Sequence, residues 1–276
     1  MNLIIQGTEV ATPDLKRLAK LTGATAIESI TPNAFRLVSA SANPEIALFC
    51  EQKKLDYALV TPGRKFADFR LVAMDMDSTL ITIESIDEIA DFMRLKSRVA
   101  EITAAGMRGE FDFKESLLQR VDLLEGADEN MLMRVYEERL RLSPGADRLL
   151  TRLHELGIKT LLVSGGFTFF TDRLARRLGL DYSYSNTLEI IGGRLTGRVL
   201  GEIVDGDGKR NELLRVRNEL GLSKQQIIGV GDGANDLKFM AECGVSIAFH
   251  AKPVVQSQAT YALNYSGLDG VLNLFD

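Results

Sequence analysis

From Leu71 onward, apolar runs of strand length alternate with segments in which apolar residues recur at helical spacing. The apolar runs are "RLVAMDMD", "IKTLLVSGG", "QIIGVGDG" and "VSIAF", and helical segments such as "TDRLARRLG" and "NELLRVRNELG" lie between some of them. Nearly continuous apolar strands are typical of a parallel sheet that helices cover on both faces. The pattern therefore predicts an α/β domain over residues 66–276, with a three-layer parallel sheet.

The segment between Ser85 and Leu142 carries little strand signal. Helical periodicity dominates it, as in "IDEIADFMRL", "FDFKESLLQRVDLL" and "NMLMRVYEERLRL". We predict a helical cap over about residues 85–142, inserted after the first strand of the α/β domain.

Residues 1–65 show a different order of elements, strand-helix-strand-strand-helix-strand. The two helices follow Thr-Pro and Asn-Pro, where a proline at the first helical position removes no needed hydrogen bond. This order predicts a small α+β domain of the ferredoxin-like type. It resembles the amino-acid-binding ACT domains in the order of its elements alone, since no glycine-rich loop follows the first strand. "TPGRKFADF" is interpreted as a linker.

Composition narrows the class of protein. Of the 276 residues, 45% are hydrophobic and 26% are charged, which is typical of a globular protein. The net charge is −5 with no cluster of Lys or Arg, so we expect no nucleic-acid partner. The first residues lack the pattern of a signal peptide and no long apolar run follows, which predicts a soluble cytoplasmic protein without a membrane partner. Cys50 and Cys243 are interpreted as inert buried thiols.

Three of the predicted strands end in polar or glycine-rich motifs: "DMDST" from Asp75, "SGG" from Ser164, and "GDGAND" from Gly231. The carboxyl ends of parallel strands meet at one edge of a sheet, where ligands bind. We therefore expect one site that combines the three motifs.

Four carboxylates would meet at that site, those of Asp75, Asp77, Asp232 and Asp236. Their mutual repulsion requires a cation, and Mg²⁺ is the expected one because it prefers carboxylate, water and phosphate oxygens. The acidic motifs do not fit the spacing of an EF-hand loop, which argues against a Ca²⁺ site of that type.

Phosphate is the expected ligand of the remaining polar groups. Ser164 offers a hydroxyl, Gly165 and Gly166 offer amides at the expected start of a helix, and Lys209 offers a positive charge. Metal, lysine, hydroxyl and carboxylate together indicate phosphoryl transfer. Asp75 and Asp77 would face the same way in an extended segment, so that one attacks phosphorus and the other transfers a proton.

These motifs resemble those of the haloacid-dehalogenase-like phosphatases. "DMDST" fits the first motif of that superfamily, and Ser164, Lys209 and "GDGAND" stand at the positions of the second, third and fourth. The resemblance implies that Asp75 is the nucleophile that becomes an aspartyl phosphate and that Asp77 is the general acid and base. It also implies that the Asp75 carboxylate, the Asp77 carbonyl and Asp232 bind Mg²⁺, and that Asp236 orients this metal shell.

The resemblance extends to substrate. The strings "MDMDSTLITIESIDEIA", "VSGGF" and "VGDGAND" are similar to those of the phosphoserine phosphatases within the superfamily. This implies hydrolysis of O-phospho-L-serine in serine biosynthesis, a cap of the C1 type, and a homodimer as one option for assembly. Phosphate binding is then assigned to Ser164, Gly165 and Lys209. Substrate binding is assigned to Glu84, Met107, Phe113, Arg120 and Asn235.

Other interpretations were weighed against this one. Glu84 also suits the first turn of a helix, and Arg120 also suits a surface ion pair with Glu115 or Asp122. "GVGDGA" formally matches a dinucleotide-binding fingerprint, which would indicate an oxidoreductase, but Asp232 would repel a pyrophosphate. A non-enzymatic amino-acid sensor, a phosphotransferase and a phosphatase for another small phosphorylated alcohol are the remaining alternatives.

Overall fold

A seven-stranded sheet forms the centre of the molecule. The computed structural model of the chain describes residues 1–276, apart from the side chain of Met107. The strand order is β11-β10-β9-β5-β6-β7-β8. The strands are β5 (Leu71–Met74), β6 (Lys159–Phe167), β7 (Tyr182–Ile191), β8 (Arg194–Leu200), β9 (Ile227–Gly231), β10 (Val245–Phe249) and β11 (Tyr261–Leu263).

The prediction of a parallel sheet holds from β11 to β7 and is wrong at the other edge. There β8 pairs antiparallel with β7. A tight turn joins these two strands, and its residues Gly192 and Gly193 both have positive φ, 59° and 76°. Two glycines in that conformation are a common signature of a β-hairpin.

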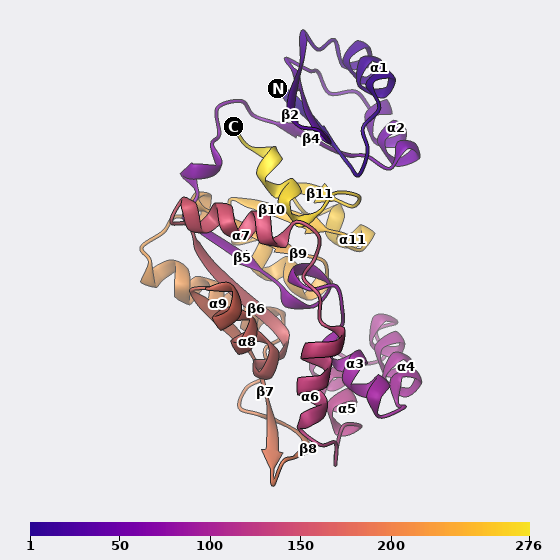
Figure 1. Ribbon diagram of the computed structural model, residues 1–276, viewed down its shortest axis with the longest axis vertical. Helices are drawn as coiled ribbons and strands as arrows, with labels where there is room; N and C mark the ends of the chain where they lie inside the picture. The colour runs from indigo at the N-terminus through magenta and orange to yellow at the C-terminus, as the bar shows by residue number, and fades with distance from the viewer.

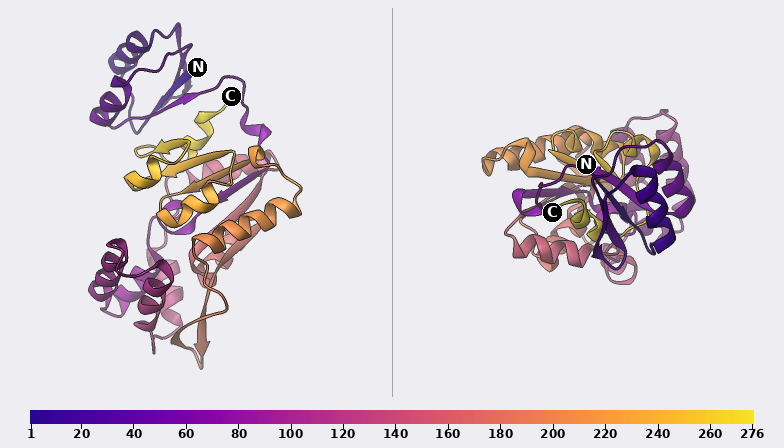
Figure 2. Two further views of the ribbon diagram at one scale, coloured as in Figure 1. Left: turned by 180° about the vertical axis from the view of Figure 1, so that it is seen from behind. Right: turned by 90° about the horizontal axis from the view of Figure 1, so that it is seen from above.

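Helices cover both faces of the sheet, as Figures 1 and 2 show. Val72 and Met74 of β5 pack in one hydrophobic cluster with residues of α7 (Ala146–Glu155) and α8 (Thr168–Leu178). Leu71 and Ala73, which point to the opposite face, pack in a second cluster with residues of the helices beyond β8. These helices are α9 (Gly206–Glu219), α10 (Leu237–Met240) and α11 (Pro253–Gln256). The α/β domain therefore has the three layers that its apolar strands predict.

The chain between β5 and β6 is helical, in agreement with the sequence. It contains α3 (Ser85–Phe92), α4 (Lys96–Met107), α5 (Phe113–Asp122), α6 (Asn130–Arg134) and a π-helical turn (Val135–Arg139). We call residues 85–139 the helical segment. It lies at the end of the molecule opposite the N-terminal strands (Figure 1). None of the described helices has both the length and the hydrophobicity of a transmembrane helix.

The first sixty residues form a separate antiparallel sheet with the predicted order of elements. These elements are β1 (Asn2–Gln6), α1 (Thr12–Thr22), β2 (Ala26–Thr31), β3 (Ala34–Val38), α2 (Glu45–Lys53) and β4 (Asp56–Val60). The strand order is β2-β3-β1-β4. Leu3 and Ile5 of β1 pack against Leu15 and Leu18 of α1 in a core of their own. We call residues 1–60 the N-terminal unit.

The other face of the N-terminal sheet packs against the α/β domain. Ile4 and Val60 join the large cluster that also contains Phe66 and Phe275. The ring centroids of Phe66 and Phe275 are 5.7 Å apart. The segment interpreted as a linker thus contributes a buried aromatic side chain from a 3₁₀ turn, Phe66–Asp68. This contact area is apolar and joins the two parts of the chain.

The two cysteines are free and buried. Burial raises the pKa of the Cys50 thiol to about 12 and also raises the pKa of Cys243. Both thiols stay protonated at neutral pH, which supports their interpretation as inert.

Asp56 makes a buried polar contact between the N-terminal unit and the α/β domain. Its buried carboxylate accepts hydrogen bonds from the amides of Asn264, Tyr265 and Ser266, the shortest of them 2.6 Å. We predict that Asp56→Ala lowers the free energy of unfolding by about 2–4 kcal/mol, because three amides lose a charged acceptor. Urea unfolding measures this change. Asp147→Ala, which removes an exposed carboxylate, serves as the control, and an equal loss in both variants would contradict the prediction.

Candidate active site

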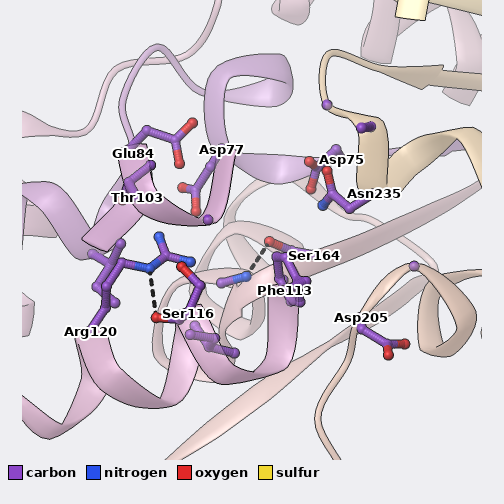
Figure 3. Close-up of a pocket in the computed structure, with 18 of the residues that line it drawn as sticks. Asp75, Asp77, Glu84, Thr103, Phe113, Ser116, Arg120, Ser164, Asp205 and Asn235 are labelled. Atoms are coloured by element: carbon purple, nitrogen blue, oxygen red, sulfur yellow. Dashed lines mark hydrogen bonds between the residues drawn. The ribbon is translucent and has the colours of Figure 1, made fainter. Parts of the chain in front are cut away.

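A cleft of about 1090 Å³ opens where β5, β6 and β9 end, beside the helical segment (Figure 3). The cleft combines residues from all three motifs with residues of the helical segment. Those predicted from the sequence are Asp75, Asp77, Glu84, Phe113, Arg120, Ser164, Gly165, Asp232 and Asn235. Lys209 and Asp236 lie beneath its floor, with no exposed surface. The tertiary structure therefore brings the motifs to one site.

The first motif lies in a turn rather than in an extended strand. β5 ends at Met74, and the amide of Asp75 still bonds to the carbonyl of Val230 in β9, at 3.1 Å. Ser78 then adopts a left-handed conformation with φ of 56°. Asp75 and Asp77 both face the cleft, and both keep the extended φ and ψ on which the prediction of their shared direction rests.

Lys209 neutralises two of the carboxylates. Its Nζ lies 2.8 Å from Oδ1 of Asp75 and 2.7 Å from Oδ1 of Asp236. Burial works to lower the pKa of Lys209, but the Asp236 and Asp75 carboxylates outweigh it and raise that pKa. The ammonium is therefore charged. Lys209 lies in the first turn of α9.

The carboxylate cluster carries more negative charge than the one ammonium of Lys209 can neutralise. Asp75, Asp232 and Asp236 each place an oxygen within 4.8 Å of the others. Burial first, and then the Asp236 carboxylate, raise the pKa of Asp232 to about 7. The same two causes raise the pKa of Asp75, against the effect of Lys209. An oxygen-binding cation would remove this repulsion, so the donor set fits a metal ion.

Asp236 differs from the other two acids of this cluster. One of its oxygens accepts the hydrogen bond from Lys209, and the other accepts the amides of Asp232 and Gly233 at 3.1 and 2.9 Å. It therefore shapes the loop that carries Asp232. The arrangement is compatible with the orienting role that the resemblance implies for Asp236.

Hydrogen bonds connect Asp77 and Ser78 of the first motif to the two residues at the start of α3. Asp77 accepts the amide of Ser85 at 3.2 Å and its hydroxyl at 2.9 Å. Ser78 in turn donates its hydroxyl to Glu84 at 2.7 Å. Burial, and then the negative charge of Glu84, raise the pKa of Asp77. A raised pKa favours the protonated form of the carboxyl group, which is the form that a general acid needs.

The second motif offers its groups from the end of β6. The Gly166 amide donates to the Ser164 hydroxyl at 2.9 Å (Figure 3). A Cβ at Gly165 would lie 2.8 Å from the Phe113 ring, and one at Gly166 would lie 2.9 Å from Oδ2 of Asp77. Both glycines are needed for these close contacts. Helix α8 begins only at Thr168, so the expectation that the two glycine amides open that helix is wrong.

Arg120 and Glu84 lie at the part of the cleft formed by the helical segment. Arg120 donates its Nε to the carbonyl of Ser116 at 3.2 Å. Burial lowers the pKa of Arg120, and the nearby Asp87 and Glu84 counteract this effect. Arg120 thus faces the cleft rather than forming a surface pair with Glu115 or Asp122. Glu84 precedes α3 as its N-cap residue, where burial raises its pKa.

Several site residues were not found from the sequence. Ser78, Ser85 and Asp87 contact or face the predicted groups, yet each resembles an ordinary residue near a helix start. Their nearness to Glu84 was the one available signal. The predicted contact of Met107 falls on a side chain outside the described residues. Asp232 belongs to the carboxylate cluster, which argues against a pyrophosphate at the "GVGDGA" segment.

The sequence matches a known family over most of its length. The model of the haloacid dehalogenase-like hydrolase family matches residues 72–241. A model of a domain of unknown function matches residues 3–46. A phosphoserine phosphatase from Polaromonas sp. is 54% identical over 221 residues, which cover 78% of this chain and 94% of that protein.

Two solved structures resemble the fold. The unliganded crystal structure of a probable phosphoserine phosphatase from Vibrio cholerae has a TM-score of 0.86 and 36% identity, and the match covers 99% of this chain and 86% of that one. A structure described as a phospho-aspartyl intermediate analogue of phosphoserine phosphatase has a TM-score of 0.71 and 33% identity. It covers 75% of this chain and 99% of that one.

Proposed function

The chain belongs to the haloacid dehalogenase-like hydrolase family, and from this we propose that it is a phosphoserine phosphatase that hydrolyses O-phospho-L-serine to L-serine and phosphate. One observation carries the proposal. A single cleft has a buried Asp75–Lys209 pair beneath it, and an acid and a base, Glu84 just before α3 and Arg120 on α5, line its other part. The floor suits a phosphoryl group and the other part suits a zwitterion.

The reaction has two steps in which Asp75 and Asp77 have different roles. An oxygen of Asp75 bonds to phosphorus while the bond from phosphorus to the serine oxygen breaks, and Asp77 gives its proton to that oxygen. Water then bonds to phosphorus and gives a proton to Asp77, and the bond between Asp75 and phosphorus breaks. The raised pKa of Asp77 supports its role as the acid.

The phosphoryl oxygens are bound by neutral and positive groups of the chain. Ser164 and the amide of Gly165 lie at the end of β6, and Lys209 lies beneath Asp75. Charge on these oxygens spreads in the transition state, so fixed donors stabilise it more than the ground state. Asn235 lines the same part of the cleft.

The metal of this site is proposed to be Mg²⁺. The carboxylates of Asp75 and Asp232 and the carbonyl of Asp77 would bind it, with Asp236 orienting the loop. When bound, Mg²⁺ neutralises charge on the phosphoryl group and on the carboxylates. The excess of buried carboxylates over ammonium groups supports a divalent ion of this kind.

Substrate recognition is assigned to the helical segment, which we interpret as a C1-type cap over residues 85–142. Glu84 would pair with the ammonium group of phosphoserine and Arg120 with its carboxylate. Phe113 covers Gly165 of the second motif and would exclude water from the phosphoryl group. Met107 is assigned to the same contact. Residues 1–65 are interpreted as an ACT-like domain, and none of them lines the described cleft.

The nucleophile is tested with Asp75→Asn. Because the amide cannot form the aspartyl phosphate, we predict that phosphate release from O-phospho-L-serine falls at least about 1,000-fold. The measurement is phosphate release at saturating Mg²⁺, with circular dichroism to verify the fold. Asp147→Asn, in an exposed first-turn position of α7, is the control and should match the wild type. Activity of Asp75→Asn within tenfold of the wild type would exclude Asp75 as the nucleophile.

Substrate recognition is tested with Glu84→Gln and Arg120→Ala. Each removes one charge that would pair with the amino acid, so kcat/KM for phosphoserine should fall by about 10- to 100-fold. The value for p-nitrophenyl phosphate, which lacks both charged groups, should change much less. Glu137→Gln, at an exposed position of the helical segment, is the control. Equal losses of kcat/KM on both substrates would mean that Glu84 and Arg120 do not recognise the charged groups of the amino acid.

Binding of Mg²⁺ can be measured without catalytic turnover, through the melting temperature of the protein. Because the cation relieves repulsion in the folded protein, saturating Mg²⁺ should raise the melting temperature by about 4 °C or more. Removal of metal with EDTA should abolish phosphate release, and added Mg²⁺ should restore it. Asp232→Asn should lose most of the thermal shift. An undiminished shift in that variant would place the ion at another site.

A further inference from the structure

A buried asparagine outside all the sequence motifs connects two parts of the active site. Asn186 lies in β7 and only 1% of its surface is exposed. Its Nδ2 donates to the carbonyl of Gly165, and its Oδ1 accepts the amide of Val204, both at 2.8 Å. A carbonyl can only accept and an amide can only donate, so the partners determine the orientation of the side-chain amide.

The bond to Gly165 fixes the peptide that joins Gly165 to Gly166. Asn186 donates a hydrogen bond to the carbonyl of this peptide. The N–H of the same peptide, which belongs to Gly166, donates to the Ser164 hydroxyl at 2.9 Å. Since the Ser164 oxygen accepts this bond, its own proton remains for another acceptor. Ser164 lines the cleft, so that acceptor can be a phosphoryl oxygen. Asn186 therefore orients, through one peptide plane, the hydroxyl that would meet the phosphoryl group.

The bond to Val204 fixes the start of α9. Val204 precedes Asp205, the N-cap residue, whose carboxylate accepts the amides of Asp207 and Gly208, both at 2.9 Å. The carbonyl of Asp205 accepts the amide of Lys209 at 2.9 Å. The position of Val204 thus determines where the first turn of α9 places Lys209. Among the described hydrogen bonds, Asn186 bonds to neither Ser164 nor Lys209, yet it joins the segments that carry both.

We propose that Asn186 is a positioning residue that sets the spacing of Ser164 and Lys209 around one phosphoryl group, an inference that rests on the proposed function. The position needs an uncharged side chain with one donor and one acceptor on the same planar group. An ionised aspartate keeps the acceptor for Val204 but offers no donor to Gly165 and places a charge at a buried position. Serine is too short to bridge both partners.

The experiment compares Asn186→Asp and Asn186→Ser with the wild type below the melting temperature of each protein. We expect kcat to fall by about 10- to 100-fold with phosphoserine and with p-nitrophenyl phosphate alike, because the loss concerns the phosphoryl group that both share. KM should change less than kcat. Affinity for inorganic phosphate, measured by calorimetry with Mg²⁺ present, should fall about tenfold.

Ser185→Ala is the matched control. Ser185 precedes Asn186 in β7, is buried, and shares a hydrogen bond of 2.8 Å with Thr171 of α8. This variant also loses a buried hydrogen bond, but no contact with Gly165 or Val204. It should lower the melting temperature and leave kcat and phosphate affinity within about twofold of the wild type.

Two results would overturn the proposal. One is a folded Asn186 variant with a lower melting temperature but with kcat and phosphate affinity like those of the wild type, which means a structural role only. The other is a loss confined to phosphoserine, which would connect Asn186 to recognition of the amino acid. If the wild type cleaves p-nitrophenyl phosphate but not phosphoserine, the proposed substrate is wrong. The role of Asn186 can then still be tested with p-nitrophenyl phosphate and with inorganic phosphate.

Discussion

The ion pairs of Lys209 with Asp75 and Asp236 are the interaction on which the site depends. Burying the ammonium of Lys209, which has no exposed surface, costs free energy unless nearby anions replace the lost hydration. Both carboxylates lie within 2.8 Å of it, and they come from β5 and from the loop after β9. The pair therefore fixes the position of α9 against two central strands. The same lysine reduces the repulsion within the cluster of Asp75, Asp232 and Asp236, of which the first and last are buried.

The hydrogen bonds around Asp77 connect chemistry to recognition. Ser85 binds Asp77, and Ser78, which follows Asp77, binds Glu84. The proposed acid and the proposed ammonium-binding group thus share one network at the start of α3. A displacement of the helical segment relative to β5 would change the hydrogen bonds between Ser85 and Asp77. This arrangement links the position of the proposed cap to the proton transfer that it would protect from solvent.

The N-terminal unit takes no part in lining the described cleft. It contacts the α/β domain through an apolar face and through the Asp56 carboxylate, which binds three consecutive amides. The helical segment lies at the opposite end of the molecule (Figure 2). Besides Asp56, the ion pair of Arg36 with Asp276 and the hydrogen bonds of Gln6 with Gly270 and Asn273 form the polar part of the contact between the N-terminal unit and the α/β domain.

Much of the fold and the site could be read from the sequence, because buried parallel strands have a recognisable pattern and their ends meet at one edge. This reasoning located Asp75, Ser164 and Asp232. The sequence did not reveal the edge hairpin, the later start of α8 or the environment of Lys209. Nor did it identify Asn186, whose role depends on two partners distant in the chain. Sequence determined which chemical groups are present, and tertiary structure alone decided which of them meet, because hydrogen bonds and charge pairs between distant residues leave no local periodic signal.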